Sequence, residues 1–469
     1  MRQKKQLIVR QVVVTDYAAE GKSLARVDGK VIFISGAVPG DKVDIRLTKS
    51  KKDWAEGRVI HIHEFSTLRT EPFCHHFGIC GGCKWQMLPY EEQLRYKQRE
   101  VEDHLKRIGK VELPDILPII GAAETRFYRN KLEYTFSSKR YYPEEEFQKM
   151  REEGIAPAPA LGYHIPGYFD KVIDINECHL QSEPSNSIRN AVREIAFQKN
   201  FTFYDIRSHE GWLRNLVIRS STTGEVMLNF CLGYEDQENG KILFDEVLRQ
   251  FPGLTTLVYT INRKMNDSIH DLNPEVYFGP GFITEKLEGF EFRIGPKSFF
   301  QTNSRQGERL YQIARDFAGL TGKEILYDLY CGTGSIGIFM SKNTSKVIGV
   351  EVIEEAVRDA KINASVNGLS HADFYAGDVA DLCNDAFFQD HGRPDVVITD
   401  PPRAGMHGKL ISTLLEIAAP VVVYVSCNPA TQARDLSLLN EKYMVARIQP
   451  VDMFPHTHHI ENVVQLKLR

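Results

Sequence analysis

Short apolar runs separated by helix-like stretches dominate the last third of the chain. Five runs of four to seven residues have this character: 324–330, 346–352, 372–375, 395–399 and 421–426. Between the second and third runs, residues 353–366 have the pattern of a helix. Strands that alternate with helices at this spacing predict a parallel sheet with helices on both faces, which is an α/β, Rossmann-like fold.

Strand-like runs of another kind occupy the first 60 residues. They are short, and Gly and Pro break the chain between them, at Gly21, Gly36 and 39–40. This texture predicts a small β-barrel over residues 1–63, and the five-stranded OB-like barrel that binds oligonucleotides is the natural candidate. The lysines of 49–52 lie beside Trp54, so phosphate contacts and a stacking surface would be neighbours. A barrel of this type can also be only a docking module.

The middle of the chain contains both helix-like and strand-like segments. Leu94, Val101, Leu105 and Ile108 recur at helical spacing and predict an amphipathic helix over 90–108, which is expected to pack on the C-terminal α/β part. Apolar runs on either side of Thr-Thr-Gly at 222–224 predict a hairpin, and the charged, proline-containing stretch 141–159 predicts a long exposed loop. The expected domains are a barrel at 1–63, a central α+β domain at 64–290 and the Rossmann-like α/β domain at 291–469.

Composition and charge narrow the classes of protein. The net charge is −4, but residues 1–60 carry 13 Lys/Arg against 7 Asp/Glu, so a basic N-terminal module precedes a body of net −10. No apolar run approaches the roughly 18 residues of a membrane-spanning helix, and the N-terminus lacks the apolar core of a signal peptide. The expected location is the cytoplasm. There, eight cysteines favour metal binding or catalysis over disulfides.

A glycine-rich segment at 328–337 follows the first run of the α/β part and contains G-x-G-x-x-G. Its glycines permit a tight turn, and the next helix presents backbone amides to a ligand. Glu351 ends the following run, where a carboxylate accepts hydrogen bonds from ribose hydroxyls. NAD sites and S-adenosylmethionine sites share this pattern. Asp-Pro-Pro-Arg at 400–403 favours the second, because methyltransferases that act on nucleobases often carry an acidic residue and two prolines after a strand.

Cys427 directly follows the apolar run 421–426 and precedes Asn428 and Pro429. This position predicts a thiol at the rim of the sheet, where open α/β sheets bind ligands. With the 400–403 loop and the His-rich segment 456–461, it indicates one site that contains a nucleophile, a ligand-binding loop and a base. The alternatives are a small buried hydrophobic residue for Cys427 and a surface carboxylate for Glu461.

Three further thiols, Cys74, Cys80 and Cys83, fall within one short glycine-containing loop. A fourth ligand must come from elsewhere, and Cys178 is the best remaining candidate. Four thiolates suit zinc or an iron–sulfur cluster, and His75, His76 and His179 add to the zinc alternative.

Together these segments resemble the RNA uracil-5-methyltransferase family, of the type that acts on 23S ribosomal RNA. The resemblance rests on Phe-Phe-Gln-Thr-Asn at 299–303, the glycine loop, the Asp-Pro-Pro-Arg loop, Ser-Cys-Asn-Pro at 426–429 and the segment 454–461. These stand in the family's order along the chain. The N-terminal barrel is similar to a TRAM domain, so the resemblance covers nearly the whole chain.

The resemblance implies a site and two cofactors. S-adenosylmethionine would contact Gln301, Tyr330, Glu351 and Asp400, with Asp378 as a further candidate. Cys427 would attack C6 of a uracil as the nucleophile, and Glu461 would remove the C5 proton as the base. The Cys-x5-Cys-x2-Cys pattern and the distant cysteine would hold a [4Fe–4S] cluster on Cys74, Cys80, Cys83 and Cys178.

The implied product is 5-methyluridine in RNA, with 23S ribosomal RNA as the expected substrate and transfer RNA as the alternative. An amino-group nucleobase methyltransferase is another alternative, but it would have no use for Cys427 or Glu461. A non-catalytic RNA-binding protein or an NAD-dependent dehydrogenase would explain fewer of the motifs. No membrane association and no protein partner are expected.

Overall fold

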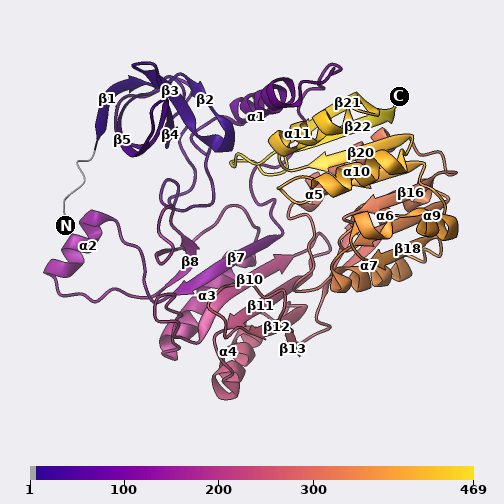
Figure 1. Cartoon of the computed structure of the whole chain (residues 1–469). Helices are drawn as coiled ribbons and strands as arrows, with labels where there is room; N and C mark the ends of the chain where they lie inside the picture. The colour runs from indigo at the N-terminus through magenta and orange to yellow at the C-terminus, as the bar shows by residue number, and fades with distance from the viewer. Residues whose placement is uncertain (1–6) are drawn as a thin grey trace.

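The computed structural model describes residues 7–469, so the first six residues of the predicted barrel lie outside the described part of the chain. Three sheet-containing parts succeed one another along the chain (Figure 1). The N-terminal part lies at the upper left of the view, the central part at the bottom and the C-terminal part at the right. Among the described residues, no helix combines the length and the apolar content that crossing a membrane requires.

The N-terminal part is one curled sheet of six strands, in the order β1-β5-β6-β4-β3-β2. It has one strand more than the sequence predicted, the two-residue β2, which pairs only with β3 at its edge. Apolar side chains of the other strands fill its interior. The strands are β1 (Ile8–Val13), β2 (Asp16–Tyr17), β3 (Ser23–Val27), β4 (Lys30–Ser35), β5 (Lys42–Ser50) and β6 (Trp54–Glu64).

The predicted helix over 90–108 is confirmed, as α1 (Tyr90–His104) followed by a π-helical turn (Leu105–Gly109). It packs against α11 (Pro429–Leu439) of the C-terminal part. Val101 and Leu105 are buried as their spacing predicted, but Ile108 is 42% exposed. Two polar side chains of this helix, Gln93 and Lys97, are instead completely buried.

The central part is a seven-stranded sheet in the order β13-β12-β11-β10-β7-β8-β9, and α3 and α4 share its core. The predicted hairpin is confirmed, since Ser220 of β10 pairs with Val226 of β11. Its elements are β7 (Lys131–Ser137), β8 (Ala160–His164), β9 (Val172–Asp174), α3 (Ser185–Gln198), β10 (Leu213–Ser220), β11 (Val226–Leu232), α4 (Gln237–Gln250), β12 (Thr256–Ile261) and β13 (Glu275–Phe278).

The stretch 141–159 is exposed as predicted, but it is not only a loop, because it contains the helix α2 (Glu144–Glu152). Three glutamates occupy the first turn of α2, and Lys149 and Arg151 occupy its last turn. This arrangement favours a helix, because acidic groups stabilise the positive N-terminal end of the helix dipole and basic groups the negative C-terminal end. Charge and proline content alone therefore gave the wrong prediction for this segment.

The C-terminal part confirms the predicted parallel sheet and adds two antiparallel strands, in the order β18-β17-β16-β19-β20-β22-β21. One face packs on α5, α6 and α7, and the other on α1, α9, α10 and α11. The strands are β16 (Ile325–Leu329), β17 (Lys346–Glu351), β18 (Ala372–Ala376), β19 (Val396–Thr399), β20 (Val421–Ser426), β21 (Tyr443–Val451) and β22 (Glu461–Leu468). The helices are α5 (Ser304–Ala318), α6 (Ser335–Met340), α7 (Glu354–Val366), α8 (Val379–Leu382), α9 (Asp385–His391) and α10 (Gly408–Ile417).

A hairpin of β14 (Ile283–Leu287) and β15 (Phe290–Ile294) lies across the predicted boundary at residue 290. Its apolar side chains belong to the same core as α5, α6 and α7. Asn363 and Asn367 of α7 also accept hydrogen bonds from backbone amides of β15, both at 2.8 Å. The predicted boundary therefore falls within a hairpin that packs with the C-terminal core.

Candidate active site and cysteine cluster

Three predicted residues meet at one edge of the C-terminal sheet. Asp400 directly follows β19, Cys427 directly follows β20, and Glu461 is the first residue of β22. Strands β20 and β22 run antiparallel with Ser426 opposite Asn462, so the end of β20 lies beside the start of β22. The sheet register therefore brings together an acid, a thiol and a second acid that are far apart in sequence.

The loop after Asp400 is fastened to the turn that carries Cys427. The carbonyl of Arg403 accepts hydrogen bonds from the Asn428 side chain at 3.1 Å and from the Thr431 hydroxyl at 3.3 Å. Asn428 also caps α11, because its side-chain oxygen accepts a hydrogen bond from the Ala430 amide. Asn428 thus joins the two loops and fixes the turn next to the thiol.

The charges in this cluster suppress ionisation of its acidic groups. Burial raises the pKa of the Cys427 thiol to about 12, with help from the negative charges of Glu461 and Asp400 and against the positive charge of Arg403. Burial also raises the pKa of Asp400 to about 7. The pKa of Glu461 is well above its usual value because of burial and the charge of Asp400. A cation would favour ionisation of all three groups.

The glycine-rich segment forms a tight loop between β16 and α6. Tyr330 has a left-handed backbone with φ of +63°, and the Gly332 amide donates a hydrogen bond to Glu351 at 3.1 Å. Gly334 has φ of +76°, and a Cβ there would lie 2.9 Å from the Phe374 ring. The positive φ and the nearby ring together explain the glycine at 334, because a larger residue there would be strained and would collide with Phe374.

Tyr330 and Glu351 lie close to each other and to Asp378. Burial raises the pKa of Tyr330, and the charges of Asp378 and Glu351 raise it further. Asp378 also caps α8, since its carboxylate accepts a hydrogen bond from the Ala380 amide at 2.8 Å. These three predicted residues therefore come together at the ends of β16, β17 and β18.

Gln301 lies just before α5 and is 7% exposed. Its carbonyl accepts a hydrogen bond from the Asn130 side chain at 2.9 Å, which joins this segment to the central part. Tyr311 of α5 was not predicted as a site residue, but its hydroxyl is near the side chain of Gln301 and the charge of Asp400, and lies 3.0 Å from Ser335. No motif of the sequence marks Tyr311, which has the spacing of an ordinary core residue.

The histidines of the segment 456–461 are not the solvated imidazoles of an ordinary surface loop. His456 is 7% exposed, and His458 and His459 are half-buried. Burial lowers the pKa of each imidazole to about 4, so all three are neutral near pH 7. The segment is therefore a packed part of the site.

The four predicted cluster cysteines line one small cavity of about 80 Å³. It lies between the 74–83 loop and the segment that carries Cys178, and the Gly82 amide donates a hydrogen bond to the Cys80 sulfur at 3.4 Å. Burial raises the pKa of each of these thiols. As placed, residues 7–469 contain no group of three or more His, Cys, Asp or Glu side chains that could hold a metal ion. The cluster therefore stays a prediction.

Of the other thiols, Cys231, Cys331 and Cys383 are buried, as expected for ordinary packing residues.

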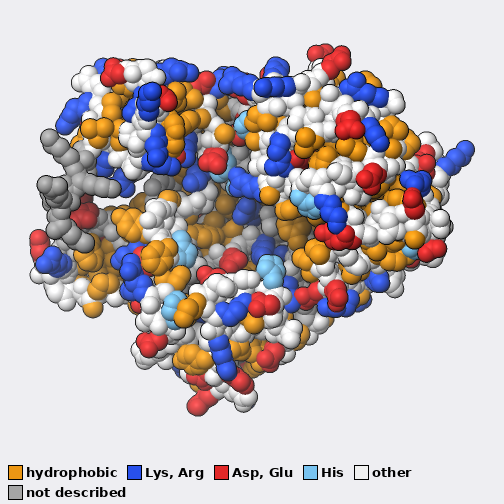
Figure 2. All heavy atoms as spheres, in the orientation of Figure 1, with side chains coloured by type: hydrophobic (Ala, Val, Ile, Leu, Met, Phe, Trp, Pro, Cys, Tyr) orange, Lys and Arg blue, Asp and Glu red, His pale blue; other side chains and the backbone are white. Residues whose placement is uncertain are grey.

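The molecular surface is hollowed where the three sheet-containing parts face one another, and Lys and Arg side chains lie around this hollow (Figure 2). A surface of this kind suits a polyanion.

Comparison with known proteins agrees with this architecture. Residues 275–469 match the tRNA (Uracil-5-)-methyltransferase family model, and residues 7–60 match the TRAM domain. An uncharacterized RNA methyltransferase of Bacteroides thetaiotaomicron is 54% identical over 96% of this chain and 100% of its own length. Another from Porphyromonas gingivalis is 50% identical over 97% of this chain and 98% of its own length.

One solved structure is similar to nearly the whole of this chain. The tRNA (uracil-54, C5)-methyltransferase of Pyrococcus abyssi, in complex with S-adenosyl-L-homocysteine, is 27% identical and has a TM-score of 0.74. The match covers 97% of this chain and 100% of that one. The C-terminal part thus has the class I methyltransferase fold, preceded by a TRAM domain of β-strands. The chain belongs to the tRNA (uracil-5-)-methyltransferase family, whose members are S-adenosylmethionine-dependent RNA methyltransferases.

Proposed function

We propose that this enzyme transfers a methyl group from S-adenosylmethionine to C5 of a uridine in RNA through a covalent adduct with Cys427. The observation that carries the proposal is the grouping of Cys427, Asp400 and Glu461 at the adjoining ends of β20, β19 and β22. The amino-group alternative leaves the thiol and the second carboxylate without a task.

The first step makes C5 of the uracil nucleophilic. Uracil C5 is too weak a nucleophile to attack a sulfonium methyl group unaided. Cys427 reacts as its thiolate, having released its proton to water, and its sulfur adds to C6, which turns the ring into an enolate with a nucleophilic C5. C5 then takes the methyl group, and S-adenosylhomocysteine leaves. Gln301, Tyr330, Glu351 and Asp400 would hold the methyl donor beside this carbon.

The second step regenerates the aromatic ring. After methyl transfer, C5 carries both the new methyl group and its original proton. The Glu461 carboxylate removes that proton, the electron pair forms the C5–C6 double bond, and the Cys427 thiolate is expelled. The positive charge of the bound sulfonium would favour the ionised form of Glu461 before transfer, since nearby opposite charge lowers a carboxyl pKa.

Two variants test the two roles. Cys427→Ala should abolish methylation and also the covalent adduct with RNA that contains 5-fluorouridine. Glu461→Gln should still form the adduct on ordinary RNA but should fail to release it, so a denaturation-resistant protein–RNA complex accumulates. Cys231→Ala, a change of a buried thiol in β11 of the central sheet, serves as the matched control. Methylation by Cys427→Ala, or normal turnover by Glu461→Gln, would refute the corresponding role.

We propose 23S ribosomal RNA as the substrate. The support is the TRAM barrel together with four cysteines around one cavity, a combination that resembles the ribosomal type of the family. Transfer RNA is the second candidate, favoured by the likeness to the Pyrococcus tRNA enzyme over nearly the whole chain. Mapping of 5-methyluridine in both RNAs from a strain that lacks this protein distinguishes them: loss from transfer RNA alone would refute the ribosomal assignment.

We also propose that Cys74, Cys80, Cys83 and Cys178 hold a [4Fe–4S] cluster. Four thiols that line one cavity fit such a group, which is typically held by four thiolates. Once bound, the cluster would supply a cross-link between the 74–83 loop and Cys178, and methyl transfer itself needs no electron from it. Anaerobically purified protein should contain iron and sulfide and absorb near about 400 nm. Cys178→Ser should lose both signals and Cys231→Ser should keep them, whereas stoichiometric zinc without iron would refute the proposal.

A further inference from the structure

The face of helix α1 that packs on the C-terminal part contains two buried polar side chains. Gln93 and Lys97, one turn apart, are both completely buried, although neither is a residue type that prefers the interior. The Lys97 ammonium lies 2.6 Å from the Asp452 carboxylate, and neither side chain has any exposed surface. A buried pair of this kind is weak evidence for stability, because desolvation offsets the attraction between the charges. Its presence needs another explanation.

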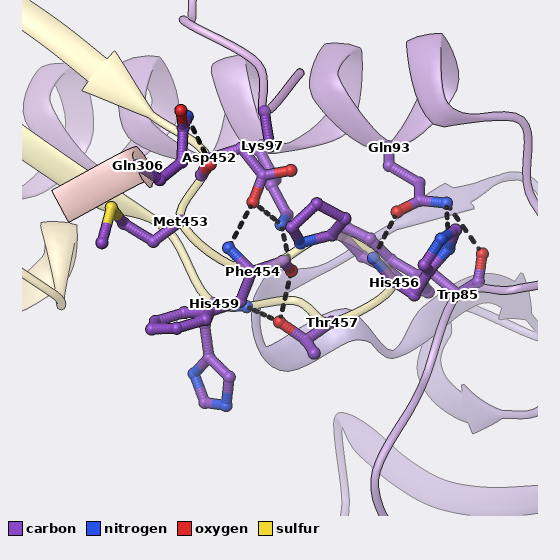
Figure 3. Close-up of polar contacts among 12 residues, drawn as sticks. Trp85, Gln93, Lys97, Gln306, Asp452, Met453, Phe454, His456, Thr457 and His459 are labelled. Atoms are coloured by element: carbon purple, nitrogen blue, oxygen red, sulfur yellow. Dashed lines mark hydrogen bonds and ion pairs between the residues drawn. The ribbon is translucent and has the colours of Figure 1, made fainter. Parts of the chain in front are cut away.

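The side chains of Lys97 and Gln93 both form hydrogen bonds with the segment 452–457 (Figure 3). Lys97 donates to the Asp452 carboxylate and, at 3.2 Å, to the Phe454 carbonyl. The Gln93 side-chain oxygen accepts a hydrogen bond from the His456 amide at 2.8 Å, and its nitrogen lies 3.2 Å from the His456 imidazole. Lys97 and Gln93 therefore hold this segment at two successive points.

A third residue of α1 and several residues outside this helix also donate hydrogen bonds to the segment. The Tyr90 hydroxyl of α1 donates to the second Asp452 oxygen at 2.9 Å. Gln306 and Asn303, at the start of α5, donate to the carbonyls of Asp452 and Met453 at 2.8 and 2.9 Å. Further donors are Tyr128, to the Pro455 carbonyl, and the Lys84 and Trp85 amides, to the His456 carbonyl.

This held segment is not a relaxed turn. His456 has a left-handed backbone with φ of +64°, which is unfavourable for a residue with a Cβ and persists only where the surroundings impose it. The segment joins β21 to β22, and Glu461 is the first residue after it in a strand. The position of the Glu461 carboxylate relative to Cys427 is therefore set from two sides, by the pairing of Glu461 with Val451 in the sheet and by the segment that leads into it.

We propose that Lys97, Gln93 and Tyr90 of α1, acting through Asp452 and His456, are positioning residues for proton removal by Glu461. The inference rests on the proposed function, in which Glu461 takes the C5 proton. The three residues touch neither RNA nor methyl donor in this role. They fix the segment that leads to the base, so their loss should slow release of the methylated product more than formation of the adduct.

The decisive variants avoid leaving a charge buried without a partner. Lys97→Met alone would strand the Asp452 carboxylate, so Lys97→Met is combined with Asp452→Asn to give a neutral pair of similar size. Tyr90→Phe is the milder variant, which removes one hydrogen bond to Asp452 and keeps the ring. Glu92→Gln is the matched control on the same helix, because Glu92 pairs with Arg95 at the surface and, within residues 7–469, makes no hydrogen bond or ion pair of its own with the segment 452–457.

Each protein is mixed with ordinary substrate RNA and S-adenosylmethionine, and adduct formation and adduct decay are timed separately. Wild type and Glu92→Gln should release the adduct at the same rate. The double variant should release it on the order of tenfold more slowly, the effect of one lost charged hydrogen bond, and Tyr90→Phe should be slowed less. Capture of 5-fluorouridine RNA, which needs the thiol but no base, should stay within about twofold of wild type.

The outcomes separate the inference from the proposed function. If Glu461→Gln traps the adduct while both α1 variants release it at the wild-type rate, the positioning role is wrong and the base assignment stands. Equal loss of adduct formation, cofactor binding and thermal stability in the α1 variants would assign Lys97 to general stability and overturn the inference. Normal release by Glu461→Gln would overturn the base assignment itself.

Discussion

The electrostatics around Cys427 lead to a specific prediction about the methyl donor. Without ligands, burial and two neighbouring carboxylates keep the thiol protonated by raising its pKa to about 12. The thiolate is nevertheless the nucleophile. We therefore expect the sulfonium charge of S-adenosylmethionine to lower the thiol pKa, so that the nucleophile becomes competent only when the methyl donor is bound.

The expected size of this shift follows from Coulomb's law. With a pKa of about 12, roughly one thiol in 10⁴ to 10⁵ is ionised at neutral pH. A unit positive charge about 5 Å away, at an effective dielectric constant of about 20, contributes about 3 kcal/mol, or about two pKa units. The bound donor should therefore raise the thiolate fraction about a hundredfold.

The assay is the rate of alkylation of Cys427 by iodoacetamide as a function of pH, followed by mass spectrometry of the peptide that contains it. S-adenosylmethionine and its charged analogue sinefungin should shift the alkylation profile to lower pH. S-adenosylhomocysteine is the matched control, because it fills the same site without the sulfonium charge. Glu461→Gln should shift the profile of the ligand-free protein in the same direction, since it removes a negative neighbour.

Two results would refute the reasoning. Equal shifts with S-adenosylmethionine and S-adenosylhomocysteine would mean that occupancy of the site, not charge, controls the thiol. A thiol pKa at or below 9 in the ligand-free protein would mean that burial and the carboxylates do not suppress ionisation.

Three other predictions follow from the structure. Gly21→Ala should lower stability more than Gly29→Ala, by about 1–3 kcal/mol in chemical unfolding, because both glycines have positive φ but only at Gly21 would a Cβ collide with His458, at 2.9 Å. Burial raises the pKa of Asp328 from 3.8 to about 7, so its folded form binds a proton more tightly than its unfolded form, and stability falls as pH rises through this range. Asp328→Asn should therefore reduce the difference in melting temperature between about pH 5 and pH 8, and an unchanged difference would contradict the raised pKa. Trp54→Ala should weaken RNA binding by about 1–3 kcal/mol if the ring stacks on a base, while Trp54→Phe should retain most of the affinity.

Much of the C-terminal fold could be predicted because its signals are local. Most residues of each parallel strand are apolar, and the turns after β16, β19 and β20 contain glycine, proline or both kinds of breaker. The turns also carry Tyr330, Asp400 and Cys427, since parallel strands place their ends at one edge of the sheet. Fold class and site position thus came from the same pattern.

What could not be predicted depends on contacts between distant segments. The helical spacing of α1 identified an apolar stripe, but Ile108 of that stripe is exposed and Lys97 is buried. No local rule buries a lysine, because its burial depends on Asp452, 355 residues away in the chain. The predicted boundary at residue 290 divides the hairpin β14–β15 for a similar reason, since the partners of β15 are side chains of α7.

The segment 452–457 shows why the C-terminal sheet alone does not complete the site. The sheet supplies Cys427, but the segment before Glu461 is held by α1, by the start of α5 and by the amides that follow Cys83. The barrel also reaches this region, since the Trp85 side chain donates to the Gly21 carbonyl and Gly21 lies against His458. The segment before Glu461 is therefore supported by contacts from the barrel, from α1, from the residues after Cys83 and from the start of α5, and loss of any one of these contacts would remove part of that support.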